Sequence, residues 1–267
     1  MDNVRNKWII IISIIFALLT IAVSYFGSLF SQGWQDLGAT IAAMMVFVQY
    51  LVTIIALILG YGTIISEIER GSMSSLVSLS ATRLEILLGK FLGLGAVLSL
   101  TIVIGFGAAG LVIAANVSNV NVGEYLIFLG ATILFALIFL SIAMFISTVF
   151  KKRSSAIGGA VLIWFFFLFF IQIIFTGVLA ASVGLKGIIS GTIPEWYYGM
   201  ELINPVSVYS DVISINVAPI FQAVQGSTGI SLQYPWFITN WLLLPIMLVW
   251  IVVFFCLAFW RFQKLDI

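Results

Sequence analysis

Residues Tyr125 to Phe150 form the sequence YLIFLGATILFALIFLSIAMFISTVF, in which no side chain is charged. A helix needs about 20 mostly apolar residues to cross the hydrocarbon core of a bilayer. Within that core the backbone N–H and C=O groups must be hydrogen-bonded inside the segment, which favours a helix. The stretch therefore predicts a membrane-spanning helix, and it decides the class of fold.

Five other stretches of the chain also lack charged residues. They are Trp8 to Gln35, Leu37 to Ser66, Phe91 to Gly123, Ser154 to Leu185 and Val212 to Trp260. The last is too long for one helix, but prolines and glycines between Pro219 and Pro235 interrupt its first half. We therefore expect an all-α integral membrane protein with a single domain of six transmembrane helices. The spans are predicted near residues 8–30, 41–65, 86–115, 125–149, 156–181 and 236–260.

The composition agrees with a membrane protein. Charged residues make up 8% of the chain and hydrophobic residues 63%, whereas roughly 25% of a soluble domain is charged. The net charge of +1 gives no indication of nucleic-acid binding, and no nucleic-acid partner is expected. Cys256, the single cysteine, lies within the last predicted span, so an intrachain disulfide is excluded.

The lysines and arginines predict the orientation in the membrane. Ten of the eleven fall on one side of the predicted spans, and only Lys186 falls on the other. The ten are Arg5, Lys7, Arg70, Arg83, Lys90, Lys151, Lys152, Arg153, Arg261 and Lys264. Because cytoplasmic loops carry an excess of positive charge, both termini are predicted to be cytoplasmic in a multi-pass protein of the cell membrane. The apolar run of the first span exceeds a signal-peptide core, so we interpret it as a permanent anchor.

The long outer link, residues 182–235, is unusually apolar and aromatic. Apolar pieces such as Val206 to Ala218 are too short to span a bilayer, and aromatic residues favour the headgroup zone. We expect short re-entrant or interfacial helices here, with an irregular surface loop as the alternative.

The inner link, residues 66–90, carries the clearest local signals. Gly71 is a plausible end for a cytoplasmic extension of span two, because glycine readily adopts the left-handed conformation of a helix end. Ser72 to Leu79 then resembles a short helix. Thr82 and Glu85 have the T-x-x-E spacing of a capping box, which predicts a new helix leading into span three.

The sequence offers little for catalysis. It contains no histidine, which removes serine–histidine catalysis and most zinc sites. The carboxylates of the outer link, Glu195, Glu201 and Asp211, are expected to be solvated loop charges. A G-x-x-x-x-G-K-[ST] phosphate loop is also missing, because Phe91 follows Gly89 and Lys90. We expect neither enzymatic activity nor a resident cofactor, and any energy for transport must come from another polypeptide.

The inner link resembles that of the permeases of type-2 ABC transporters. Their pattern is close to E-x-E-x-G-T, then L-L-S-x-P-x-S-R, then E-I-L-L-G-K-F-L-G. Here Glu67 to Ser72 is EIERGS, Leu76 to Leu84 is LVSLSATRL and Glu85 to Gly93 is EILLGKFLG. Ser72 replaces the usual threonine and Ser80 the usual proline. Leu202 to Val206 is similar to an L-x-N-P-V element of the outer link in the same family.

The resemblance implies a dimer of permeases, either two copies of this chain or a pair of related ones, with two cytoplasmic ATPase subunits that bind ATP and magnesium. Nitrous oxide reductase maturation permeases and drug or antibiotic exporters are both similar in length. Export of a hydrophobic or amphipathic substrate is the first reading. There are two alternatives. One is a non-transporting subunit that passes ATPase motion to an external protein, and the other is a membrane enzyme or scaffold without an ATPase.

Ser72 to Ala81 is predicted to be the coupling helix that docks on the ATPase, because a permease without a nucleotide site must receive work through a cytoplasmic element. Its apolar side chains need a partner or the lipid surface to cover them. An amphipathic helix lying on the inner leaflet is therefore the alternative. The predicted coupling residues are Glu67, Glu69, Arg70, Gly71, Met73, Leu76, Val77, Leu79 and Arg83.

A substrate path, if present, is predicted along small and polar stripes of spans two and five. Ordinary packing between helices explains such stripes equally well. The candidate path residues are Gln49, Thr53, Phe165, Phe169, Gln172 and Thr176.

Overall fold

The computed structural model describes Leu18 and residues 37–71, 82–116, 121–189, 193–217 and 234–265. Every regular element in these ranges is a helix, which confirms the all-α class. Five segments are long and apolar enough to cross a membrane. They are Met44–Glu69, Arg83–Ala115, Val122–Val149, Arg153–Gly184 and Asn240–Gln263. They match the second to sixth predicted spans, whereas the first, residues 8–30, lies outside the described residues.

Two of these segments combine α-helix with a π-helical turn. The second span consists of α2 (Leu37–Phe47), the π-helix η1 (Val48–Val52), α3 (Thr53–Gly60) and α4 (Ile65–Glu69). The fifth consists of α8 (Arg153–Phe165), the π-helix η2 (Phe166–Phe170) and the part of α9 (Ile171–Ile189) before Gly184, where the backbone is non-helical with a φ of 68°. The other elements are α6 (Arg83–Asn116), α7 (Val122–Val149), α10 (Glu195–Glu201), α11 (Pro205–Asn216) and α13 (Asn240–Gln263).

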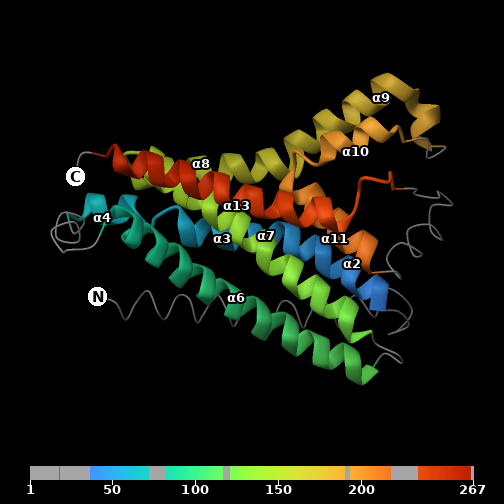
Figure 1. Cartoon of the computed structure of the whole chain (residues 1–267), viewed down its shortest axis with the longest axis horizontal. Coiled ribbons are helices and arrows are strands. Elements are labelled where there is room, and N and C mark those ends of the chain that lie inside the picture. Colours follow the sequence, from blue (N-terminus) through green and yellow to red (C-terminus); the bar gives the residue numbers. More distant parts are fainter. Residues whose placement is uncertain are drawn as a thin grey trace.

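Helix α7, which contains residues 125–149 of the stretch quoted first, is the centre of the bundle. Helices α3, α6, α11 and α13 all pack against it, as Figure 1 shows. In the most apolar 18-residue stretch of α7, 61% of the residues are buried. In the corresponding stretches of the α8–α9 span and of α13, only 17% are buried. Phe128, Phe135 and Phe139 of α7 are completely buried. The uncovered outer faces of α8, α9 and α13 are apolar, as expected of surfaces that meet lipid or another membrane subunit.

Glycines permit the closest approaches to α7. A Cβ atom at Gly60 of α3 would lie 2.4 Å from the Cβ of Ala143, and one at Gly95 of α6 would lie 2.9 Å from Cδ2 of Leu137. Small residues at membrane helix interfaces allow backbones to approach in this way. At Gly60, the small-residue stripe of span two is therefore a packing surface against α7.

A side chain of α7 also stabilises the break between α3 and α4. The chain turns at residues 61–64, and the first N–H groups of a new helix lack partners within that helix. Ser147 Oγ accepts hydrogen bonds from the N–H groups of Ile64 at 2.8 Å and Ile65 at 3.1 Å. The bend in span two is thus fixed by a buried hydroxyl group on the neighbouring helix.

Apart from Lys186 of α9, the lysines and arginines in the described ranges gather at one end of the bundle, here called the basic end. The end of α4, the start of α6, the start of α8 and the end of α13 all lie there (Figure 1). This arrangement agrees with the charge distribution on which the predicted cytoplasmic orientation rests.

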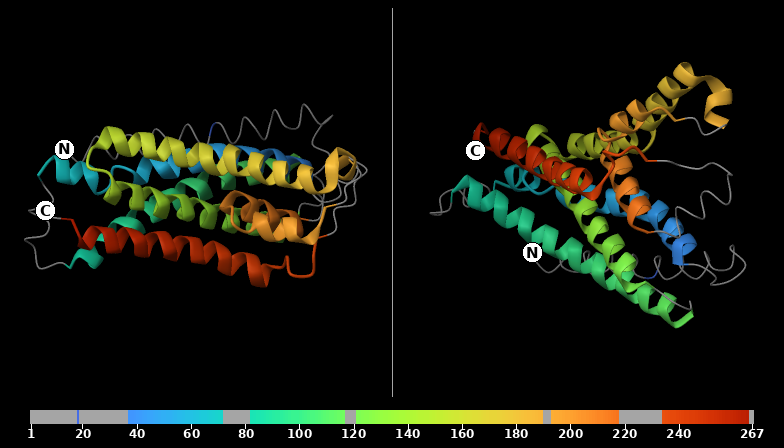
Figure 2. Two further views of the ribbon diagram at one scale, coloured as in Figure 1. Left: turned by 90° about the horizontal axis from the view of Figure 1, so that it is seen from above. Right: turned by 45° about the vertical axis from the view of Figure 1, so that its right-hand side comes forward.

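At the opposite end, the predicted short helices of the outer link are α10 and α11, both seen in Figure 2. Helix α11 does not lie on the surface but packs between α7 and α13. Its Tyr209 is fully buried, stacks on Phe135 with a centroid separation of 4.6 Å, and shares a 3.1 Å hydrogen bond with Thr132. For residues 193–217, the alternative of an irregular surface loop is therefore wrong.

Candidate functional site

The first candidate site surrounds the two ends of the predicted coupling segment at the basic end. Gly71 has a left-handed φ of 70°, as expected of a residue just after a helix. At the other end, the backbone N–H of Thr82 donates to Glu85 Oε2 at 2.7 Å, and the N–H of Glu85 donates to Thr82 Oγ1 at 3.3 Å. These reciprocal bonds confirm the predicted capping box.

An ion pair joins the helices on either side of this segment. Lys90 Nζ of α6 lies 2.5 Å from Glu67 Oε1 of α4 and also donates to the carbonyl oxygen of Thr63 at 3.1 Å. Both charged side chains are largely buried, with exposed fractions of 16% and 22%. The end of span two and the start of span three are thereby tied together.

Two further contacts extend this junction to other helices. Arg83 Nη1 donates to the carbonyl oxygens of Phe262 and Gln263, each at 2.8 Å, near the end of α13. The Glu69 carboxylate accepts from the backbone N–H of Arg153 at 2.8 Å, at the start of α8. Four helices therefore meet around the two anchored ends of the link.

The predicted coupling residues are thus placed as follows. Glu67, Glu69 and Arg83 connect helices of this chain, whereas Arg70 is exposed. Met73, Leu76, Val77 and Leu79 lie outside the described residues, and their docking role stays a prediction.

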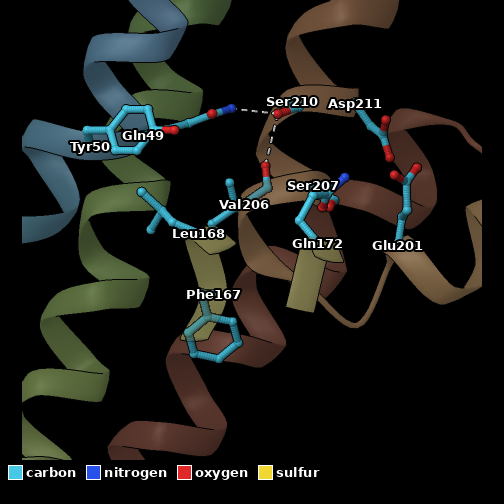
Figure 3. A pocket seen from close by; sticks show the side chains of 10 residues that line it. All are labelled: Gln49, Tyr50, Phe167, Leu168, Gln172, Glu201, Val206, Ser207, Ser210 and Asp211. Atoms are coloured by element: carbon cyan, nitrogen blue, oxygen red, sulfur yellow. Dashed lines mark hydrogen bonds between the residues drawn. The ribbon is translucent and has the colours of Figure 1, made fainter. Parts of the chain in front are cut away.

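The second candidate site is a pocket near the opposite end, with a volume of about 310 Å³ (Figure 3). It is lined from η1, η2, α9, α10 and α11. Its lining residues are Gln49, Tyr50, Phe167, Leu168, Gln172, Glu201, Val206, Ser207, Ser210 and Asp211. Gln49 Nε2 donates to Ser210 Oγ at 2.7 Å, so the second span is bonded to α11 at this point.

Both π-helices contribute to the pocket wall, and such single-turn insertions are frequent at functional sites. Asn204 fixes one of them. Its Nδ2 donates to the carbonyl oxygen of Phe167 in η2 at 3.1 Å, while its Oδ1 accepts from the N–H of Val206 at 3.0 Å and caps α11. The asparagine of the L-x-N-P-V element therefore aligns α11 with the fifth span.

Two carboxyl groups, Glu201 and Asp211, face each other in this pocket (Figure 3). Asp211 is 6% exposed, and its Oδ2 atom has no hydrogen-bond partner among the described residues. Burial, with a further contribution from Glu201, raises the pKa of Asp211 to about 8. Burial also raises the pKa of Glu201, against the opposing effect of hydrogen bonds from Tyr197 and Gln172.

The expectation that these carboxylates are solvated loop charges is therefore wrong for Asp211 and for Glu201. Glu195, at the other end of α10 from Glu201, is exposed as expected. Asp211 is buried and Glu201 is half-buried. The sequence offers no periodic signal for this pair, because its two members lie on different short helices. Their burial depends on how α10 and α11 pack against the spans.

The predicted path residues do not form one surface. Gln49 and Gln172 line the pocket. Thr53 is fully buried in the bundle, whereas Phe165 and Thr176 are exposed. Phe169 packs against Tyr50, with their ring centroids 5.9 Å apart. A shared role of the six in transport stays a prediction.

The fold and its site define a multi-pass protein of the cell membrane that has no phosphate loop of its own. The chain belongs to the ABC-2 family of transporter proteins, whose family model matches residues 1–267. It is therefore a transmembrane permease of an ABC transporter, as the resemblance of the inner link predicted.

Two curated relatives are both named "Probable ABC transporter permease protein NosY". The relative from Stutzerimonas stutzeri is 32% identical over 271 residues, which cover 98% of this chain and 94% of the relative. The relative from Pseudomonas aeruginosa is 35% identical over 214 residues, which cover 78% of this chain and 76% of the relative.

Proposed function

We propose that this permease exports a hydrophobic or amphipathic substrate, driven by ATP and magnesium bound to separate cytoplasmic ATPase subunits. The active unit contains two permeases, either two copies of this chain or this chain and a related one. Membership of the ABC-2 family supports this proposal, as does the lack of a phosphate loop in the sequence.

The observation that carries the proposal is the junction at the basic end. A force on the coupling segment would act on two helix ends that are fixed, at Gly71 and at the Thr82–Glu85 capping box. The Glu67–Lys90 pair and the Arg83 contacts would distribute the force to α4, α6 and α13. A loop without such contacts would absorb the movement instead of transmitting it.

A second candidate function is the relay of ATPase motion to an external protein without transport. It is favoured by the contacts at both ends of α13. At the basic end α13 accepts hydrogen bonds from Arg83, and at the other end Asn240 exchanges two 2.8 Å hydrogen bonds with Asn216 of α11. One continuous helix therefore connects the junction to the short outer helices.

The test is purification of the permease from its native membrane through a tag, followed by identification of the ATPase that copurifies and co-expression of the two. Replacement of Leu76 and Leu79 by aspartate should abolish ATPase association or uncouple hydrolysis from transport. A control variant with Lys151 and Lys152 replaced by aspartate changes another loop at the same end. Full assembly and coupled activity in the leucine double variant would contradict the coupling role.

Reconstitution in proteoliposomes separates the two functions. Export predicts ATP-dependent accumulation of a substrate and stimulation of ATP hydrolysis by that substrate. A relay predicts stimulation of ATP hydrolysis only by an external partner protein, with no movement of small molecules.

A further inference from the structure

The pocket between the second span, the fifth span and α11 has an unbalanced charge. Its ten lining residues include two acids, Glu201 and Asp211, and no lysine or arginine. Their carboxyl groups point toward each other from different helices (Figure 3). Two facing carboxylates repel each other unless a proton or a cation lies between them. Either occupant would have to enter from outside the pocket lining.

Asp211 gives the second, independent indication of a ligand. Its side chain is more than nine-tenths buried, and its Oδ2 lacks a hydrogen-bond donor within the part of the chain that the structure describes. A buried polar atom without a partner is costly, and such atoms are rare in folded proteins. Glu201 is better satisfied, because Tyr197 and Gln172 donate hydrogen bonds to it. The pocket therefore has one acceptor that a donor on a ligand would complete.

The remaining wall of the pocket is different in character. Tyr50, Phe167 and Leu168 line it from the two π-helices. These side chains offer apolar and aromatic surface. Aromatic rings also attract cations through their faces. A pocket of about 310 Å³ lies at the lower end of the usual range for small-molecule sites.

We propose that this pocket binds an amine with an apolar body, whose ammonium group donates hydrogen bonds to Asp211 and Glu201 and whose apolar part lies against Tyr50 and Phe167. The inference rests on the proposed export function, for which it names the substrate class. An ammonium ion supplies both the positive charge and the N–H donors that the carboxyl pair lacks. Such a charge-assisted bond is stronger than a neutral one.

The test uses radiolabelled 2-phenylethylamine and the purified full-length permease in detergent, without the ATPase. We expect saturable binding that 2-phenylethanol and 3-phenylpropionate, the neutral and anionic analogues, do not displace. Asp211→Asn and Glu201→Gln should each weaken binding about tenfold or more, because each removes a charge-assisted hydrogen bond. Glu195→Gln, on the same short helix as Glu201 but exposed, is the matched control and should bind like the wild type.

Size-exclusion profiles and thermal unfolding show whether each variant is folded. Two acids on two helices are tested, so the inference stays falsifiable if one variant misfolds. Equal displacement by the alcohol, unchanged binding in a folded Asp211→Asn or Glu201→Gln variant, or an equal loss in Glu195→Gln would overturn it. ATPase assembly is measured separately, so a failure to bind amines leaves the export proposal standing for another substrate class.

Discussion

Lys90 Nζ and Glu67 Oε1 lie 2.5 Å apart and join the end of the second span to the start of the third. The ten residues between Gly71 and Thr82 are the predicted coupling segment. The ion pair therefore joins the two helices from which this segment begins and ends. Ion pairs on exposed surfaces contribute little, but these two side chains are mostly buried. The pair is therefore expected to contribute to stability as well as to the transmission of movement.

The ion pair can be tested by a double-mutant cycle. Glu67→Gln and Lys90→Gln should each lower the free energy of unfolding by about 1 kcal/mol, because each leaves a partly buried charge without its partner. The double variant, Glu67→Gln with Lys90→Gln, should lose less than the sum of the two single losses, because the second change removes the charge that the first left without its partner. Denaturant unfolding in detergent measures the three variants. Strictly additive losses would show that the two side chains do not interact.

The bend in span two depends on one hydroxyl group. Ser147→Ala removes the acceptor of two backbone N–H groups, Ile64 and Ile65, and should lower the free energy of unfolding by about 1–3 kcal/mol. Ser141→Ala is the matched control, because within the described ranges the hydroxyl of this buried serine of α7 bonds only to the carbonyl oxygen of Ile138 in its own helix. Thermal unfolding should show a larger loss for Ser147→Ala. Equal losses would mean that the bend does not need the hydroxyl.

The tight contact between Gly60 of α3 and Ala143 of α7 predicts that a larger side chain at Gly60 would clash. Gly60→Ala would place a methyl group 2.4 Å from the Cβ of Ala143, and it should cost about 1–3 kcal/mol of stability. Adding Ala143→Gly should recover part of the loss. Gly130→Ala is the control, because no described atom lies within 4 Å of its added Cβ. A neutral Gly60→Ala variant, measured by thermal unfolding, would contradict the tight packing.

The orientation in the membrane can be tested with single cysteines in a Cys256→Ala background. Gly199→Cys on α10 should react with an impermeant thiol reagent applied to intact cells, and Ser155→Cys at the start of α8 should not. Both positions are exposed, and an added Cβ at Gly199 meets no described atom within 4 Å. Permeabilised cells provide the control, in which both should react. Labelling of Ser155→Cys alone in intact cells would reverse the predicted orientation.

Asp211 predicts a pH dependence of stability. Its pKa is about 8 in the folded protein, because of burial and then Glu201, against an ordinary value of 3.8. Below pH 3.8 both states hold the proton; between 3.8 and 8 only the folded state does. Stability should therefore fall as the pH rises across this window and change little above it.

Glu201, whose pKa is also raised, adds to the effect, while Tyr198 and Tyr234 face the same acids and remain neutral there. Asp211→Asn should show a flatter profile and a higher unfolding temperature than the wild type at pH 8. Thermal unfolding between pH 5 and 9 measures both. Parallel profiles for the two proteins would exclude Asp211 as the titrating group.

The parts of the structure that follow from local patterns could be predicted. The capping box at Thr82 and the left-handed Gly71 depend on neighbours within four residues, so the sequence contains all the partners. The membrane spans follow from the length of uncharged stretches such as Tyr125 to Phe150, because a bilayer imposes both apolarity and internal hydrogen bonding.

The pocket could not be predicted in the same way. Gln49 and Ser210 are 161 positions apart in the chain and meet only because α11 packs between α7 and α13. Asn204 was recognisable as part of an L-x-N-P-V element, but its bond to Phe167 depends on a π-helical turn that no local pattern indicated.

The sequence by itself determined that this is an α-helical membrane protein and where in the chain the second to sixth spans lie. Only the tertiary structure decided that Asp211 is buried, that Glu201 is half-buried and that the two face each other. The physical reason is that apolarity and helix caps are local properties of the chain, whereas the burial of a carboxyl group is set by all the helices that surround it.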